Sequence, residues 1–292
     1  MNDTHTRPDR GERFHARKAL GQHFLHDTRV LQRIAALAAP VAGSGVYEIG
    51  PGTGTLTAHL LEHDGNLRAI EKDRRCVALL RDRFGERLDL IEGDATRVNW
   101  ADQLAEADLG PAPVVVGNLP YNVAMPILFG LLGSAVRPHR IVVMLQREVA
   151  ERLLAAPGSS AYGQPSVKVQ MVADVHFGLR VGRGAFTPPP RVDSVVVVID
   201  PLAAPRFPVA DIDRFGRLVA AGFGQRRKML VNALSHGLSL DPKPIRAALV
   251  ELGLDERIRG EALSVERWAD LCRPLDALLV DARLPRRVRR IR

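Results

Sequence analysis

The chain has 292 residues, 46% of them hydrophobic and 25% charged, a balance that predicts a folded protein with one large core and a smaller domain. Its formal net charge of +8 favours a polyanionic partner, and its 5% of aromatic residues argues against a broad base-stacking platform. The two cysteines, Cys76 and Cys272, lie far apart in helical patterns, which argues against a disulfide or a metal site and favours a reducing cytosol.

Residues 1–18 are polar and charged, so they predict no signal peptide, and we expect residues 1–16 to form a flexible arm. Beyond the arm, helical spacing of apolar residues predicts helices at residues 30–39, from near Asp73, and from Arg147 to about Ala156. Short apolar runs predict buried strands at residues 46–49, 67–70, 88–91, 114–116, 141–145, 167–175 and 192–199. This alternation predicts an α/β fold with a doubly wound, Rossmann-like, mostly parallel sheet.

The last third of the chain has a different pattern. Residues 203–208 predict a linker, and beyond them the spacing is helical, with Ser264 as the expected N-cap of the last helix. We therefore expect a small C-terminal all-helical domain over residues 203–280 and a basic tail over residues 281–292. The uncharged residues 109–136 could span a bilayer by length alone, but their Asn, Gly and Pro residues favour a strand, a loop and a helix.

Polar or flexible residues follow four successive predicted strands. The first strand enters a loop with glycines at 50, 52 and 54, and the next three strands deliver Glu71, Asp94 and Asn118. Ligands of open α/β sheets bind at such carboxyl ends, where Glu71 could accept ribose hydroxyls and Asp94 an adenine amino group. A nicotinamide fingerprint would need glycine at position 55, where the chain has Thr55, so a dehydrogenase is disfavoured.

Asn118 begins the tetrapeptide Asn118-Leu119-Pro120-Tyr121, which suits methylation of an exocyclic amine. The lone pair of such an amine is delocalised into its ring until acceptors bind the amine hydrogens. Asn118 Oδ1 and the Leu119 carbonyl could be those acceptors, Pro120 fixes the backbone, and Tyr121 offers a face for stacking a purine. This chemistry needs no metal.

The loop and the tetrapeptide resemble those of the class I S-adenosylmethionine methyltransferases. Further segments resemble the ribosomal RNA adenine N6-dimethyltransferase family, and in particular its bacterial small-subunit members. These segments are residues 17–25, 144–149, 161–163, 186–194 and 225–228. The resemblance runs from about Arg17 to about Leu275, so it implies a methyltransferase domain over residues 17–202 and an RNA-binding role for residues 203–280.

The resemblance also implies roles for single residues. It assigns S-adenosylmethionine binding to His23, Leu25, Gly50, Gly52, Glu71, Asp94 and Asn118. His23 stands where the family more often has Asn, and whether it acts through its side chain or its backbone stays open. Phe186 is expected to contact the target base opposite Tyr121. The cluster Arg226, Arg227 and Lys228, expected on a helix, would hold RNA phosphates.

The implied reaction is transfer of methyl groups from S-adenosylmethionine to N6 of two adjacent adenosines in the 3′-terminal hairpin loop of 16S ribosomal RNA. The expected protein is a cytoplasmic monomer that binds the 30S subunit or its precursor, has no membrane partner, and takes part in small-subunit biogenesis. Besides the disfavoured dehydrogenase, two alternatives remain at this point. A DNA adenine methyltransferase would share the cofactor half, although Leu119 stands where its motif has Pro. A non-catalytic ribosome-assembly factor would need no methyl transfer.

Overall fold

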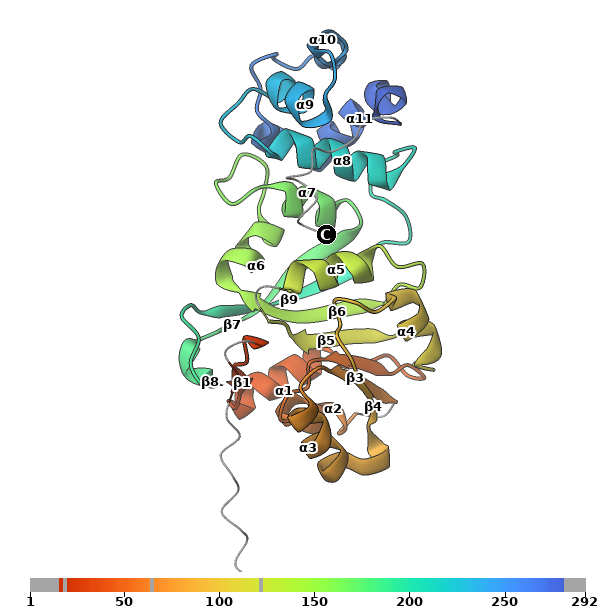
Figure 1. The fold of residues 1–292 in the computed structure, drawn as a ribbon, viewed down its shortest axis with the longest axis vertical. Coiled ribbons are helices and arrows are strands. Elements are labelled where there is room, and N and C mark those ends of the chain that lie inside the picture. The colour runs from red at the N-terminus through yellow and green to blue at the C-terminus, as the bar shows by residue number, and fades with distance from the viewer. Residues whose placement is uncertain (1–15, 18–19, 64–65, 121–122, 281–292) are drawn as a thin grey trace, which may run out of the picture.

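A seven-stranded sheet forms the centre of the N-terminal two thirds of the chain (Figure 1). The computed structural model describes residues 16–17, 20–63, 66–120 and 123–280. The strands in spatial order are β4 (Asp89–Glu92), β3 (Leu67–Glu71), β2 (Val46–Ile49), β5 (Val114–Asn118), β6 (Arg140–Gln146), β9 (Ser194–Pro201) and β7 (Ala173–Val181). The first five are parallel to one another, and β9 is antiparallel to both of its neighbours. The predicted fold class is therefore confirmed.

The strand order reverses between β2 and β5, which are direct neighbours although β3 and β4 come between them in the chain. The chain leaves β2 toward one edge of the sheet and β5 toward the other. Loops at the carboxyl ends of these two strands thus diverge and leave a crevice. A second sheet of two short strands, β1 (Phe24–Leu25) and β8 (Phe186–Thr187), lies beside this crevice and joins distant parts of the chain.

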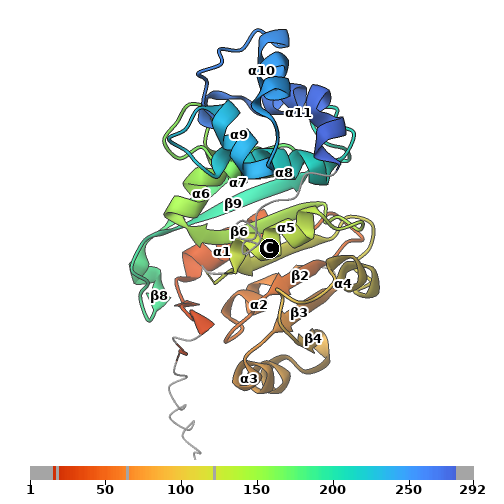
Figure 2. The same ribbon diagram turned by 45° about the horizontal axis from the view of Figure 1, so that its top comes forward.

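Helices cover both faces of the large sheet (Figures 1 and 2). One face carries α1 (Thr28–Leu37), α2 (Thr55–Leu60) and α3 (Arg74–Phe84), with the short 3-10 turns η2 (Gly85–Arg87) and η3 (Arg183–Ala185) nearby. The other face carries α4 (Trp100–Glu106), α5 (Ala124–Leu132), α6 (Arg147–Leu154) and α7 (Gln164–Gln170). Asp73 caps α3 by accepting a hydrogen bond from the Arg75 amide, so the helix expected from near Asp73 is confirmed.

The described chain beyond Pro201 contains helices and turns only. These are α8 (Ile212–Phe223), α9 (Leu230–Leu238), α10 (Pro242–Glu251), the 3-10 turn η4 (Gly260–Ala262) and α11 (Val265–Leu279). Ser264 caps α11 as expected, accepting a hydrogen bond from the Arg267 amide. One hydrophobic core continues from the sheet through α7 into these helices, where Trp268 is fully buried. The helices stack on the α6–α7 side of the sheet (Figure 1).

One predicted strand is wrong. The sequence predicts an extended segment over residues 167–175, but α7 occupies Gln164–Gln170 and the strand begins only at Ala173. Pro165 lies in the first turn of α7, where proline suits a helix, and the Gly163 amide donates to Ser166 Oγ at 3.0 Å. These N-terminal signals outweigh the β-branched residues that follow.

Other expectations concern single segments. The uncharged residues 109–136 contain strand β5 and helix α5, as predicted, and across the described ranges no helix combines the length and hydropathy needed to cross a membrane. Cys76 and Cys272 are buried and free. The tail at residues 281–292, and the arm apart from Ala16, lie outside the described residues.

Candidate active site

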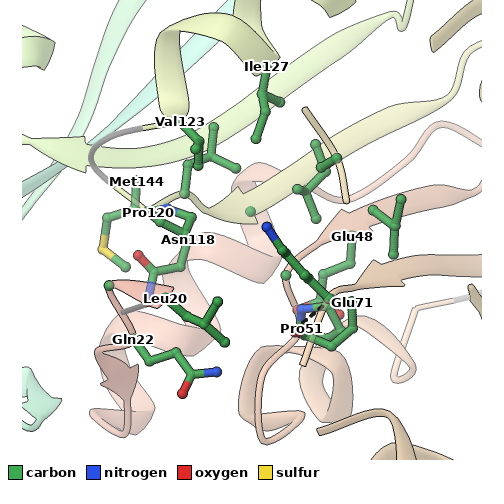
Figure 3. A pocket seen from close by; sticks show the side chains of 18 of the residues that line it. Leu20, Gln22, Glu48, Pro51, Glu71, Asn118, Pro120, Val123, Ile127 and Met144 are labelled. Atoms are coloured by element: carbon green, nitrogen blue, oxygen red, sulfur yellow. Dashed lines mark hydrogen bonds between the residues drawn. The ribbon is translucent and has the colours of Figure 1, made fainter. Parts of the chain in front are cut away.

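The carboxyl ends of β2, β3 and β5 open onto one pocket of about 190 Å³ (Figure 3). Most of the predicted site residues line it, namely His23, Leu25, Gly50, Glu71, Asp94, Asn118 and Leu119. Apolar side chains between them include Ile70, Val123 and Ile127. The structure thus brings together residues that are almost a hundred positions apart in the sequence.

The glycine-rich loop forms one wall of the pocket. Gly50 has a φ of +67°, its amide donates to the Ile70 carbonyl at 2.9 Å, and no atom lies within 4 Å of where a Cβ would stand. A ligand can therefore approach the backbone directly at Gly50. Gly52 has a φ of +59°, and a Cβ there would lie 3.1 Å from the Phe24 ring. Gly52 is not among the residues that line the pocket, and its direct contact with a cofactor stays a prediction.

Glu71 is nearly buried at the end of β3, and its carboxylate is held by backbone amides. Oε2 accepts from Gly52 at 3.0 Å, and Oε1 accepts from Lys72 at 2.8 Å and from Asp73 at 2.7 Å. Burial raises the pKa of this carboxyl above its ordinary value, and the three amides oppose the shift. Glu71 therefore organises the glycine loop and the start of α3 as well as facing the pocket, a double role that the sequence did not indicate.

Asp94 lies after β4, at the same end of the pocket as Glu71. Its Oδ2 accepts from Lys72 Nζ at 2.8 Å, and its Oδ1 accepts from the Thr96 amide and hydroxyl at 3.0 and 2.7 Å. Partial burial alone would raise the pKa of the Asp94 carboxyl, but these hydrogen bonds lower it to about 2. Asp94 is therefore ionised at neutral pH and can serve as a hydrogen-bond acceptor.

Asn118 ends β5 on the opposite side of the pocket. Its Nδ2 donates to the His23 carbonyl at 3.0 Å, which fixes the amide and leaves Oδ1 as its acceptor atom. Leu119 follows with its side chain buried against the core, and Pro120 lines the pocket beside it (Figure 3). The next residue, Tyr121, lies outside the described residues.

Residues 20–25 form the remaining wall. Leu25 pairs with Phe186 across the β1–β8 sheet, and its carbonyl accepts from Thr55 Oγ1 at 2.9 Å. His23 Nδ1 donates to the Pro188 carbonyl at 2.8 Å, while the backbone carbonyl of His23 accepts from Asn118. The side chain and the backbone of His23 thus both have structural partners, and its contact with a cofactor stays a prediction.

Phe186 does not line the pocket. Its side chain is 3% exposed and belongs to the core on the α1–α3 face of the sheet, together with Leu25 and Ile34. In this conformation its ring is covered by protein, so the predicted contact with a target base would require the ring to be uncovered. That contact stays a prediction.

Glu48 has no individual role in the sequence-based predictions, although this residue begins the segment that resembles a cofactor loop. This residue lies in the middle of the sheet on β2, lines the pocket, is 2% exposed, and accepts from Thr57 Oγ1 at 2.7 Å. Burial raises the pKa of its carboxyl to about 8, although the Thr57 hydrogen bond opposes the shift and the charge of Glu71 adds to it. A glutamate inside an otherwise apolar strand was the available signal, because a charged residue is seldom fully buried without a role.

The basic cluster is not on a helix, which corrects the prediction. Arg226, Arg227 and Lys228 lie on the turn between α8, which ends at Phe223, and α9, which begins at Leu230. All three are exposed, but Arg226 differs from its neighbours because its guanidinium bonds to backbone carbonyls of the α6–α7 loop. None of the three residues lines the pocket, and their RNA contacts stay predictions.

Comparison with known proteins places this chain in a family. The chain matches the family described as ribosomal RNA adenine dimethylase over residues 13–276. It is 47% identical to ribosomal RNA small subunit methyltransferase A of Anaeromyxobacter sp. (strain K), over 89% of this chain and 93% of that one. The protein of the same name from Geobacter sulfurreducens is 46% identical, over 91% and 97%.

Solved structures agree. A dimethyladenosine transferase from Plasmodium falciparum aligns with a TM-score of 0.73 at 26% identity, covering 87% of this chain and 98% of that one. The 23S rRNA methyltransferase ErmE shares the fold, with a TM-score of 0.64 at 24% identity, over 87% of this chain and 99% of that one. The chain therefore belongs to the ribosomal RNA adenine dimethylase family.

Proposed function

We propose that this protein transfers methyl groups from S-adenosylmethionine to N6 of two adjacent adenosines in the 3′-terminal hairpin loop of 16S ribosomal RNA, as part of small-subunit biogenesis. Membership of the family and the names of the similar proteins support an adenine in small-subunit RNA as the substrate. We propose that it acts as a cytoplasmic monomer on the 30S subunit or its precursor. Residues 17–202 would carry the methyl transfer, and the helices of residues 203–280 would bind RNA.

The residues of the pocket fit S-adenosylmethionine. Glu71 and Asp94 place two acceptors at one end, suited to ribose hydroxyls and an adenine amino group, and Ile70, next to Glu71 on β3, offers an apolar contact for a ring. Gly50 leaves its backbone open to the ligand. S-adenosylmethionine supplies a methyl group on a positively charged sulfonium, which makes that methyl electrophilic.

The single observation that carries the proposal is the fixed amide of Asn118. Because Nδ2 is held by the His23 carbonyl, Oδ1 is available to accept a hydrogen from an exocyclic amine. A hydrogen bond from the amine to Oδ1 localises on nitrogen the lone pair that was delocalised into the ring. The rigid placement of Oδ1 also aligns the amine, so no strong base is needed. The Leu119 carbonyl would accept the second hydrogen. Bases of a hairpin loop can be splayed out toward such a pocket at modest cost.

Primer extension across the two adenosines, in cells that lack this protein, tests the proposal. A wild-type copy should restore the stops that dimethyladenosine causes, and an Asn118→Ala copy should not. Asn66→Ala is the matched control, because Asn66 Nδ2 also donates to a backbone carbonyl, that of Asp108 at 3.1 Å, but precedes β3 at the opposite end of the strands. Failure of purified wild-type protein to methylate 30S subunits from those cells would overturn the proposal.

A further inference from the structure

Two sequence segments that the proposed chemistry leaves without a role meet in space. Residues 161–163 lie in the loop between α6 and α7, and residues 225–228 lie on the turn after α8 (Figure 1). Arg226 joins them, because its Nη2 donates to the Ser160 carbonyl at 3.0 Å and to the Tyr162 carbonyl at 3.1 Å. The two N–H groups of Nη2 have fixed directions in the guanidinium plane, and hydrogen bonds from this charged group are stronger than neutral ones.

Other contacts fasten the same junction. Arg226 Nε faces Glu261 Oε2 at 3.7 Å, and the backbone carbonyl of Glu261 accepts from the Gly158 amide at 2.8 Å. Beneath them the buried ring of Tyr162 packs edge-on against Phe223, with ring centroids 6.1 Å apart. The α6–α7 loop is therefore tied to the C-terminal helices both by polar contacts at the surface and by aromatic packing below.

Arg227 and Lys228 differ from Arg226. Both are exposed, and within the described residues neither side chain has a hydrogen bond or an ion pair. Their charges are thus available to a polyanion, whereas the Nη2 and Nε atoms of Arg226 face the protein.

We propose that Arg226 is a positioning residue, which holds the turn of residues 224–229 on the α6–α7 loop so that Arg227 and Lys228 meet RNA phosphates at a fixed place relative to the pocket. This inference rests on the proposed RNA substrate, and it divides the basic cluster into one structural and two RNA-contacting residues. The alternative is that Arg226 leaves its carbonyl partners and binds phosphate as well.

Charge-preserving variants separate the two roles. Lysine keeps the positive charge and can bind phosphate, but its side chain is shorter and has one nitrogen, so it cannot place donors at the two carbonyls and also face Glu261 as Arg226 does. If Arg226 positions the turn, Arg226→Lys should lower affinity for 30S subunits several-fold, while the slope of log affinity against log salt, from about 50 to 200 mM KCl, stays unchanged. Arg227→Lys, the matched control, should preserve both quantities. Arg227→Ala and Lys228→Ala should each make this negative slope shallower by about 0.7 to 0.9.

Hydrogen–deuterium exchange of the RNA-free protein gives a second readout. Arg226→Lys should speed exchange of the amides in residues 156–163 by about tenfold, the effect of losing one hydrogen bond to a charged group, and Arg227→Ala should leave them as in wild type. Wild-type exchange and wild-type affinity in Arg226→Lys, with a reduced slope in Arg226→Ala, would overturn the inference. Unchanged slopes in both Arg227→Ala and Lys228→Ala would instead count against RNA binding by this turn, and the exchange result would still decide the structural role of Arg226.

Discussion

Replacing Asn118 tests the proposed chemistry most directly. Asn118→Ala removes Oδ1, the proposed acceptor for the amine, and also removes the Nδ2 donor to the His23 carbonyl. Loss of one preorganised polar group at a reacting centre typically costs about 10²- to 10³-fold in rate, or about 2.7 to 4 kcal/mol. We therefore expect the single-turnover rate of Asn118→Ala to fall by about that factor.

Asn118→Asp divides the two functions of the amide. An aspartate keeps an acceptor oxygen on the pocket side but turns its second oxygen toward the His23 carbonyl, where the amide nitrogen now lies at 3.0 Å. Repulsion between these oxygens should displace the carboxylate, so we expect a rate between those of wild type and Asn118→Ala.

The assay is single-turnover methylation of undermethylated 30S subunits at saturating S-adenosylmethionine, with cofactor affinity measured separately by calorimetry. Saturation ensures that weaker cofactor binding does not lower the observed rate. An Asn118→Ala protein with a wild-type rate and a defect confined to cofactor affinity would refute the reasoning, because Asn118 would then be a cofactor ligand and no more.

Three further predictions concern Glu71, Glu48 and Phe186. Glu71→Ala should weaken S-adenosylmethionine binding by about 1.5 to 3 kcal/mol in calorimetric titrations, with RNA affinity unchanged, and should also lower the free energy of unfolding because three backbone amides lose their acceptor. Glu48→Gln should make the free energy of unfolding in urea less dependent on pH. The Glu48 carboxyl has a pKa of about 8 in the folded protein and about 4.5 in the unfolded chain. Its contribution to stability is therefore complete below pH 4.5 and is lost as pH rises through 8. Between pH 6 and 8 the wild type should therefore lose roughly 2 kcal/mol more than Glu48→Gln. Phe186→Ala should lower the free energy of unfolding by about 3 to 5 kcal/mol, because the ring lies in the core.

Each of these has an outcome that would contradict it. Undiminished cofactor affinity in Glu71→Ala would remove Glu71 from the cofactor site. Parallel pH profiles for wild type and Glu48→Gln would mean that Glu48 is ionised in the folded protein. Wild-type stability of Phe186→Ala would place the ring outside the core, and Phe186→Leu is its control because leucine keeps most of the apolar volume.

The ends of the parallel strands could be predicted from the sequence because each buried strand is a short apolar run of neighbouring residues. Three of the apolar runs are followed at once or within three residues by Glu71, Asp94 and Asn118, and parallel strands bring their carboxyl ends to one edge. The sequence alone therefore assigns Glu71, Asp94 and Asn118 to one pocket, and all three do line it. Their partners could not be predicted, since nothing in the sequence shows that Glu71 accepts from Gly52 or that Asp94 accepts from Lys72.

Features that depend on long-range contact were missed. Val167 and Val169 alternate as in a strand, yet both are buried in α7 between the sheet and the C-terminal helices. Resemblance alone places Phe186 at the target base, and because a two-residue strand such as β8 has no sequence signature, nothing in the sequence shows that its ring lies in the same core as Leu25. Arg226 and Arg227 are adjacent arginines that the sequence cannot tell apart. Only the hydrogen bonds of Arg226 to the Ser160 and Tyr162 carbonyls distinguish them.

The wall formed by residues 20–25 connects the proposed cofactor site with Asn118, the proposed catalytic residue. The carbonyl of His23 orients the Asn118 amide, and the carbonyl of Leu25, two residues further on, is held by Thr55 at the start of α2. Leu25 also pairs with Phe186 and lines the pocket. This one segment thus contacts the pocket, the Asn118 amide and the strand of Phe186 together. The three groups proposed to bind the cofactor, activate the amine and contact the base therefore depend on the same short stretch of backbone.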